Sequence, residues 1–315
     1  MFNKILFATT ASPTCDHAAK VAFDLAKEYN SDLHIFHVYG IPTRGASPFI
    51  TDVRTGLEES TDEDYAAWVK EELKTTYDSF LQGMERAIIR CSVGSPATEI
   101  LRCAWKEEVD LIILGGHTRQ EDAGAFRHRQ ISGSTMLRVT CGALCPVLIV
   151  SQPVHTSFWR CRDIVFSTDF SKTAMAAFKL ACRMVDHIGC KLLLFHAFKR
   201  TEMSSEQSEG QKVNVQRIAE ARRRMQELYG SQMKGKGNWE IEVREGLPDA
   251  QLLNFTREKS AALIIMAHHA REAHTSKAGI GDTIENLALQ SICPVVSVNR
   301  AERDHRRGST SLARI

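Results

Sequence analysis

The chain has 315 residues, of which 43% are hydrophobic and 25% are charged, and its formal net charge is +2. A balance this close to neutrality gives no general attraction to nucleic acid or to a membrane surface. The nine cysteines are odd in number and scattered through apolar segments, which argues against a disulfide framework and for reduced thiols. We find neither a signal-peptide pattern nor an apolar run near the roughly 20 residues that span a bilayer. We therefore expect a cytoplasmic protein.

The first half of the chain alternates short apolar runs with amphipathic helical patterns. Apolar runs of this length, followed by helical periods, are typical of buried strands in βα units. A long charged helix is expected at residues 62–86, and Pro96 stands where a further helix can begin. The expected strands of this half are residues 5–9, 33–38, 87–93, 111–114 and 147–150.

The second half repeats the first in the same order, at an offset of about 150 residues. The segment DLIILGGH at 110–117 returns as ALIIMAHH at 262–269. A period this long is the length of a domain rather than of a solenoid repeat. We predict two domains, residues 1–153 and 160–300, followed by a basic tail at 301–315 that we expect to be disordered. The expected strands of the second half are residues 163–167, 192–197, 239–243, 263–266 and 295–298.

Strands that alternate with helices imply a parallel sheet covered by helices on both faces. The sequence therefore predicts an α/β fold of two tandem doubly wound, Rossmann-like domains, each with a five-stranded parallel sheet. The last strands, at 147–150 and 295–298, are short and apolar and would lie at sheet edges, which invites pairing. We expect the two domains to pair with each other through these strands. Association of two chains into a homodimer stays open.

The segment after the fourth strand of the first half has the composition of an anion site. Gly115 and Gly116 would let a ligand approach the backbone closely, and Arg119 adds positive charge. A helix that begins near Ser134 would offer free N–H groups and the positive end of its dipole. The hydroxyls of Ser134 and Thr135 can bind a phosphate or cap the helix. The pattern fits a nucleotide phosphate, and it fits a flexible loop ending in a helix cap equally well.

The order of the elements, the sequence STDFS at 167–171, the glycine loop and the Cys-Pro pair before each last strand resemble the universal stress protein family. The tandem arrangement resembles its double-domain members, and the resemblance covers residues 3–151 and 162–299. It implies a stress-response sensor or regulator that binds an adenine nucleotide, ATP or AMP, with Mg²⁺ needed only alongside ATP. It also implies a regulatory protein partner, which the sequence does not identify.

Nucleotide-binding members of that family hold ATP through a loop of the form G-x2-G-x9-G-[ST], and an acidic residue after the first strand lies near the adenine. In the first half Thr118 replaces the second glycine, and 14 residues instead of 9 separate it from Gly133. Thr10 replaces the acidic residue. The resemblance places Val38 at the adenine and Gly115 near the ribose. The whole first-domain site that it implies is Thr10, Val38, Gly115, Gly116, Thr118, Arg119, Gly133, Ser134 and Thr135.

The second half departs from the family pattern in a complementary way. It has the acidic residue, Asp169, but alanines replace two glycines and Asp282 replaces the serine. A carboxylate at a phosphate position is repulsive, by about 1 kcal/mol at 4 Å in water and by more where solvent is scarce. We expect nucleotide in the first domain and a degenerate second site made of Asp169, Ala267, Ala270, Gly281, Asp282 and Thr283.

Two other functions stay open from the sequence. The chain is a zinc-binding member of the family if the loop histidines, such as His117, His268 and His269, converge on a metal. It is a protein-interaction module if neither half holds nucleotide. No nucleophile and no acid–base pair has a defined spacing, so we assign no catalytic residue and no resident metal. Slow ATP hydrolysis stays open.

Two pairs of twin residues are expected to be structural. Cys145 and Cys293 stand at matching positions before the last strand of each half, where a small apolar side chain fits. His37 and His196 end the second strand of each half, and their duplication indicates a packing role.

Overall fold

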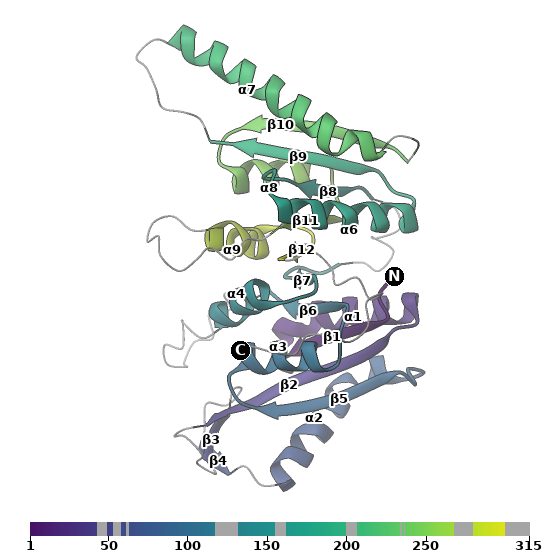
Figure 1. The fold of residues 1–315 in the computed structure, drawn as a ribbon. Coiled ribbons are helices and arrows are strands. Elements are labelled where there is room, and N and C mark those ends of the chain that lie inside the picture. Colours follow the sequence, from purple (N-terminus) through teal and green to yellow (C-terminus); the bar gives the residue numbers. More distant parts are fainter. Residues whose placement is uncertain are drawn as a thin grey trace, which may run out of the picture.

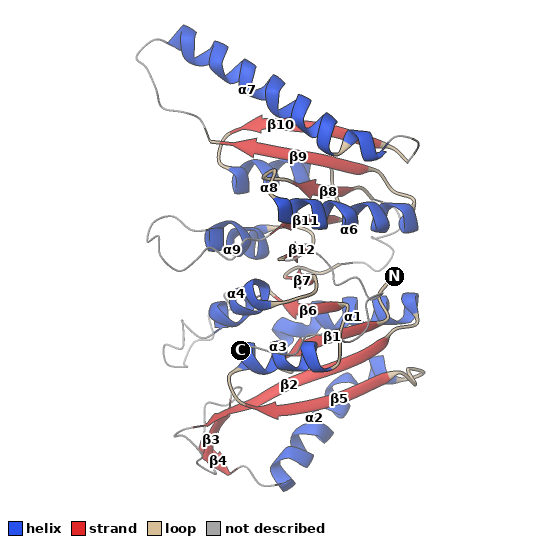
Figure 2. Ribbon diagram, in the orientation of Figure 1, coloured by secondary structure: helices blue, strands red, loops and turns tan. Residues whose placement is uncertain are grey.

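The computed structural model describes residues 1–42, 49–52, 58–60, 63–116, 132–154, 162–199, 207–233, 235, 237–267 and 280–299. These residues form two α/β units that follow one another along the chain and share one continuous sheet (Figure 1). Helices lie on both faces of that sheet (Figure 2). The fold class predicted from the sequence is confirmed.

The first unit has five parallel strands in the order β5-β2-β1-β6-β7. Buried apolar residues fill these strands, as in β1, where only the first of six residues is not fully buried. Strands buried on both faces read as continuous apolar runs, which explains why the sequence located them. The strands are β1 (Lys4–Thr9), β2 (Asp32–Pro42), β5 (Ala87–Val93), β6 (Leu111–Gly115) and β7 (Val147–Val150).

The second unit repeats this order as β10-β9-β8-β11-β12. Its strands are β8 (Ile164–Ser167), β9 (Leu192–Phe198), β10 (Trp239–Glu245), β11 (Leu263–Ala267) and β12 (Val295–Val298). The first unit is covered by α1 (Asp16–Tyr29), α2 (Glu63–Leu81), α3 (Pro96–Lys106) and α4 (Ser132–Gly142), and the second by α6 (Lys172–Ile188), α7 (Gln207–Leu228), α8 (Pro248–Glu258) and α9 (Ile280–Gln290).

Successive strand residues bury into opposite faces of the sheet. In β1, Phe7 joins a core cluster with α1 and α2, whereas Leu6 joins a different cluster with α3 and α4. The first of these clusters continues through both units and includes α6 and α7. The opposite face divides between two clusters, and α9 contributes to both.

The two units meet through β7 and β12, which run antiparallel with Val295 opposite Ile149. Helices α4 and α9 lie side by side next to this seam (Figure 1). Side-chain hydrogen bonds connect the two units on each side of this seam. The Ser151 hydroxyl donates to the carbonyl of Ala288 in α9, and the Asn299 amide donates to the carbonyl of Cys141 in α4. The predicted pairing through the last strands is therefore present.

The structure differs from the sequence expectation in the polar stretch after β2. There the chain forms a hairpin of β3 (Phe49–Asp52) and β4 (Glu58–Ser60), which extends the sheet beyond β2 in antiparallel fashion. The long helix α2 ends at Leu81, five residues earlier than expected, because the chain turns through Gly83 at a φ of 76°. A left-handed φ of this kind ends a helix and favours glycine.

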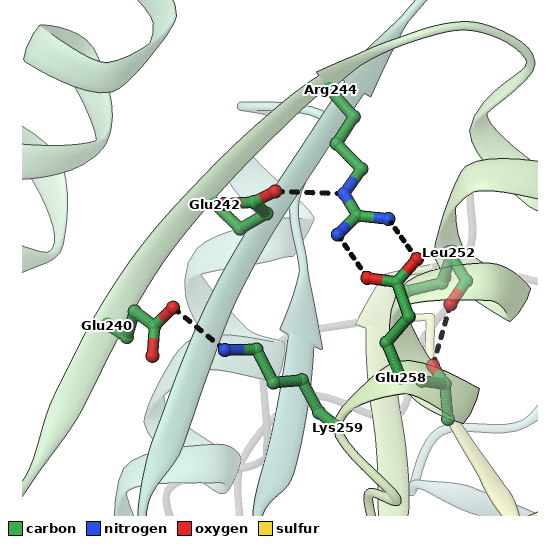
Figure 3. A network of polar contacts seen from close by, with 7 residues as sticks. Glu240, Glu242, Arg244, Leu252, Glu258 and Lys259 are labelled. Carbon is green, nitrogen blue, oxygen red and sulfur yellow. Dashed lines mark hydrogen bonds and ion pairs between the residues drawn. The ribbon is translucent and has the colours of Figure 1, made fainter.

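The two outer strands differ in how their surfaces are covered. On β10, Arg244 binds Glu242 at 2.9 Å and holds both carboxylate oxygens of Glu258, at 3.0 and 2.6 Å (Figure 3). Lys259 binds Glu240 at 3.0 Å in the same network. Strand β5 instead leaves Ile88 45% exposed. Charged side chains at a sheet edge discourage pairing with another chain.

Candidate functional site

The strand order reverses at β1, which has β2 on one side and β6 on the other. In open α/β sheets ligands bind beyond the carboxyl ends of the strands at such a switch point. Thr10 follows β1 and Gly116 follows β6, so both lie at this edge of the sheet. In the second unit β8 has the same place between β9 and β11, and Asp169 follows it closely.

The turn after β1 has an unusual backbone. Ala11 has a φ of 56°, in the left-handed region that costs an alanine about 1–2 kcal/mol. Its N–H donates to the side-chain oxygen of Thr9 at 2.9 Å, which offsets part of that cost. The hydroxyl of Thr10 lies 2.7 Å from that of Ser12 and 3.3 Å from the sulfur of Cys15. The turn is therefore fixed by its own side chains.

A buried tyrosine on α2 contacts this turn through its hydroxyl. The hydroxyl of Tyr77, on α2, lies 2.5 Å from Thr9 Oγ1, and the tyrosine is 1% exposed. Burial raises the pKa of Tyr77, so its hydroxyl stays protonated. His37 donates from Nδ1 to the Thr9 carbonyl at 2.8 Å. Three elements, β1, β2 and α2, thus converge on one threonine.

The second unit holds the corresponding turn with the same groups. Thr168 Oγ1 lies 2.6 Å from the Tyr229 hydroxyl and accepts the Phe170 N–H at 2.9 Å. His196 Nδ1 donates to the Thr168 carbonyl at 2.7 Å. The φ of Phe170 is 63°. Both twin histidines therefore have the structural role that their duplication predicts, whereas sequence reasoning missed the threonines and tyrosines.

The two turns present different chemistry at the edge of the sheet. In the first unit the residues after the strand are Thr10, Ala11 and Ser12, which are small and uncharged. In the second, Asp169 is exposed, and its carboxylate accepts the Ser171 N–H at 3.0 Å.

An aromatic and cationic layer accompanies the second turn. The ring of Phe170 lies 4.4 Å from that of His196, and the Arg224 guanidinium lies 4.5 Å over Phe170. Arg217 lies 4.4 Å over Phe198. Burial lowers the pKa of His196, and both arginines also lower it. The described first unit has no such cations stacked on its turn.

Gly116 has a packing reason to be glycine. Its N–H donates to the Val150 carbonyl at 2.9 Å, and a Cβ built on it would lie 1.7 Å from the Ser151 side-chain oxygen. Ser151 in turn binds α9 across the seam. Val38 is 6% exposed and belongs to the core cluster on the α3 and α4 face.

The phosphate-binding residues implied by the sequence fall partly outside the described residues. Helix α4 begins at Ser132, so Gly133, Ser134 and Thr135 belong to its first turn. The side chain of Thr135 is half-buried. Thr118 and Arg119 lie outside the described residues.

The residues expected to form a degenerate site in the second unit are described to a similar extent. Ala267 ends β11, and Gly281, Asp282 and Thr283 belong to the first turn of α9. Ala270 lies outside the described residues.

The metal-binding alternative finds no complete site within the described part of the chain. No three His, Cys, Asp or Glu side chains there converge as a metal site, and the loop histidines lie outside it. Burial raises the pKa of Cys145 and of Cys293 to about 12, which favours the thiol over the metal-binding thiolate. This agrees with the structural role expected for this pair.

The helices within the described ranges include none with the length and apolar character needed to cross a bilayer.

Comparison with known proteins finds one family twice in this chain. The model of the universal stress protein family matches residues 1–151 and again residues 161–299. Universal stress protein MJ0531 of Methanocaldococcus jannaschii is 30% identical over 155 residues, which cover 49% of this chain and 84% of the relative. Universal stress protein YxiE of Bacillus subtilis is 31% identical over 153 residues, 48% of this chain and 99% of the relative.

Solved structures of similar fold extend over nearly the whole chain. A universal stress protein from Archaeoglobus fulgidus matches with a TM-score of 0.65 and 19% identity, over 95% of this chain and 97% of that one. The functionally unknown protein PA1789 from Pseudomonas aeruginosa matches with a TM-score of 0.60 and 16% identity, over 95% and 92%. At these identities the likeness concerns the fold alone. With the family model matched in both halves, this chain belongs to the universal stress protein family and carries the family's domain in tandem.

Proposed function

We propose that this chain is a cytoplasmic stress-response regulator that binds one adenine nucleotide, ATP or AMP, in its first domain. We take the domains as residues 1–153 and 160–300, and we expect a regulatory protein to read the bound state. The observation that carries the proposal is the switch point of the first sheet. Thr10 after β1 and Gly115–Gly116 at the end of β6 flank it, on strands that pair directly.

The proposed contacts divide between base, sugar and phosphate. Thr10 and Val38 would border the adenine, and Gly115 the ribose. The phosphates would lie at the N-terminus of α4, because anions are stabilised at helix N-termini. The phosphate contacts would come from Thr118, Arg119, Gly133, Ser134 and Thr135, whereas Gly116, whose N–H is bound to Val150, would line the site beside Gly115. Mg²⁺ would accompany ATP and neutralise part of its charge.

Its charges make the second domain the less favourable of the two for binding a nucleotide. Asp282 stands in the first turn of α9, where its twin in α4 is Ser134. A carboxylate there repels a phosphate and cancels the attraction of the helix N-terminus. Asp169, the acidic residue that the family places near the adenine, does not remove this repulsion at the phosphates. We therefore expect one nucleotide for each chain rather than two.

The test is a calorimetric titration of the full chain with Mg²⁺ and ATP, repeated with AMP. We expect a stoichiometry of one. Replacing Ser134→Asp copies the carboxylate of the second domain into the first and should abolish binding. Ser134→Asn, of similar size but without the charge, should retain more of the affinity.

Three outcomes would contradict the proposal. Two nucleotides bound to each chain would show that the second domain is competent. No binding of either nucleotide would leave the protein-interaction module as the function of this chain. Equal losses in the Asp and Asn variants would mean that charge at the first turn of α4 does not decide binding.

A further inference from the structure

The hydroxyl of Tyr77 does more than fill the core. Its ring packs edge-on against Phe7, with centroids 5.7 Å apart, and lies 6.0 Å from Phe23. A phenylalanine would make these apolar contacts equally well. Two hydroxyls, those of Tyr77 and Thr9, are instead placed in an apolar cluster, where polar groups are costly unless they are paired.

The paired hydroxyls act on the backbone of the turn. A threonine hydroxyl has one donor and two acceptor positions. Thr9 Oγ1 accepts the Ala11 N–H at 2.9 Å and shares its remaining capacity with Tyr77 at 2.5 Å. Fixing this oxygen fixes the acceptor that holds Ala11 in its left-handed conformation, and the intervening residue is Thr10.

The same tyrosine–threonine support occurs in both units, but the residue that it positions differs. The hydroxyl distance is 2.5 Å in the first unit and 2.6 Å in the second, and the turn N–H lies 2.9 Å from its threonine in both. The residue held between the two is Thr10 in one unit and Asp169 in the other. The support is therefore separate from the chemistry that it supports.

We propose that Tyr77 is a positioning residue of the first-domain nucleotide site, acting through Thr9 to set the place of Thr10 at the switch point. The inference rests on the proposed function. Tyr229 has the same place under a turn that is not expected to hold nucleotide, so it provides a matched control within the chain.

The experiment compares Tyr77→Phe with Tyr229→Phe in the full chain. Each variant keeps its ring and loses one buried hydroxyl. We expect Tyr77→Phe to speed hydrogen exchange of the Ala11 amide and to weaken ATP binding about three- to tenfold, the equivalent of one hydrogen bond. Tyr229→Phe should speed exchange of the Phe170 amide and leave the ATP dissociation constant unchanged. A purely structural role would affect the melting temperature of both variants and the affinity of neither.

A second pair of variants, Thr9→Val and Thr168→Val, removes the acceptor oxygen itself. Hydrogen exchange of the turn amide should increase more than in the tyrosine variants, and only Thr9→Val should weaken ATP binding. The inference is overturned if Tyr77→Phe leaves ATP affinity unchanged while the unmodified chain binds ATP. It is equally overturned if Ala11 exchange does not respond to either change. If the unmodified chain binds no nucleotide while Ala11 exchange does respond, the proposed function fails and the support of the turn by Tyr77 stands.

Discussion

The turns after β1 and β8 have the same backbone and the same buried support, yet they present different side chains. Each has a left-handed residue two positions after a buried threonine, Thr9 or Thr168, with φ values of 56° and 63°. In the first unit that residue is alanine, and in the second it is phenylalanine stacked on His196 and under Arg224. The backbone of this edge is therefore set from inside the core, whereas its chemistry is set by the residues that follow each strand.

The outer strands show the same contrast at the ends of the sheet. Strand β10 is covered by the Arg244 network, whereas on β5 Arg90 binds Glu107 through one oxygen at 3.1 Å and donates to His34 at 3.3 Å.

The largest effect is expected at Gly116, where the first unit needs glycine and the second has His268. Gly116→Ala places a methyl group 1.7 Å from the Ser151 side-chain oxygen and 3.1 Å from its Cα. We expect a loss of about 2–3 kcal/mol in the free energy of unfolding, as for an overpacked core. Urea denaturation measures it. Gly237→Ala, with nothing within 4 Å, should change stability by less than about 0.5 kcal/mol. A neutral Gly116→Ala would contradict the close approach.

Loss of a charged side chain should lower the free energy of unfolding more on β10 than on β5. The side chain of Arg244 is 21% exposed and forms paired bonds to Glu258, so Arg244→Ala should cost about 1–2 kcal/mol. Arg90→Ala should cost less than about 1 kcal/mol, because its ion pair is single and its side chain is 37% exposed. Denaturation midpoints compare the two. Equal losses would remove the distinction between the edges.

The seam offers a test of whether its two sides are equivalent. Ser151→Ala removes the hydrogen bond to Ala288, and Asn299→Ala removes those to Cys141 and Ala143; each variant should cost about 1 kcal/mol. Because they lie on different sides of the seam, the double variant should be additive within about 0.5 kcal/mol. Ser231→Ala, whose hydroxyl bonds within an exposed turn, serves as the surface control. A strongly non-additive double variant would show that the hydrogen bonds of Ser151 and Asn299 are energetically coupled.

The smallest effect concerns the pH dependence of stability in the second unit. Burial lowers the pKa of His196 below the usual 6.5, so the unfolded chain binds this proton more readily than the folded one. The contribution of His196 is present above pH 6.5 and is lost as the pH falls through its lowered pKa. Melting temperatures measured from pH 7.5 to 5 should fall less steeply in His196→Gln than in the unmodified chain. An unchanged slope would mean that His196 is not a source of the dependence.

The sequence predicts the architecture well because its signals are strong and occur twice. Apolar runs such as 111–114 and 263–266 locate strands buried on both faces, and each is checked by its twin. The β3–β4 hairpin could not be found in this way, because its residues are mixed in polarity and have no twin with the same structure. Sequence reasoning located Thr10 and Asp169 at the sheet edge through the family resemblance.

The supporting hydroxyls escaped sequence reasoning for a physical reason. Tyr77 and Tyr229 have the helical spacing of core residues, and nothing in a periodic pattern distinguishes a core ring from a core hydroxyl that has a distant partner. Thr9 is 68 residues from Tyr77 in the chain, so their contact depends on how α2 packs on β1. The internal repeat contained the missing signal, because each threonine and tyrosine recurs in the second half.

The antiparallel seam between β7 and β12 changes what substitution can do to this molecule. When two separate copies of a chain associate, every change in sequence appears on both sides of the symmetry axis, and the pairing weakens on dilution. Here the partner is tethered, so the pairing is independent of protein concentration, and each change appears once. One copy is therefore free to lose a function that the other keeps. The first domain has Ser134 where the second has Asp282, a difference between equivalent positions that a symmetric pair of identical chains does not permit.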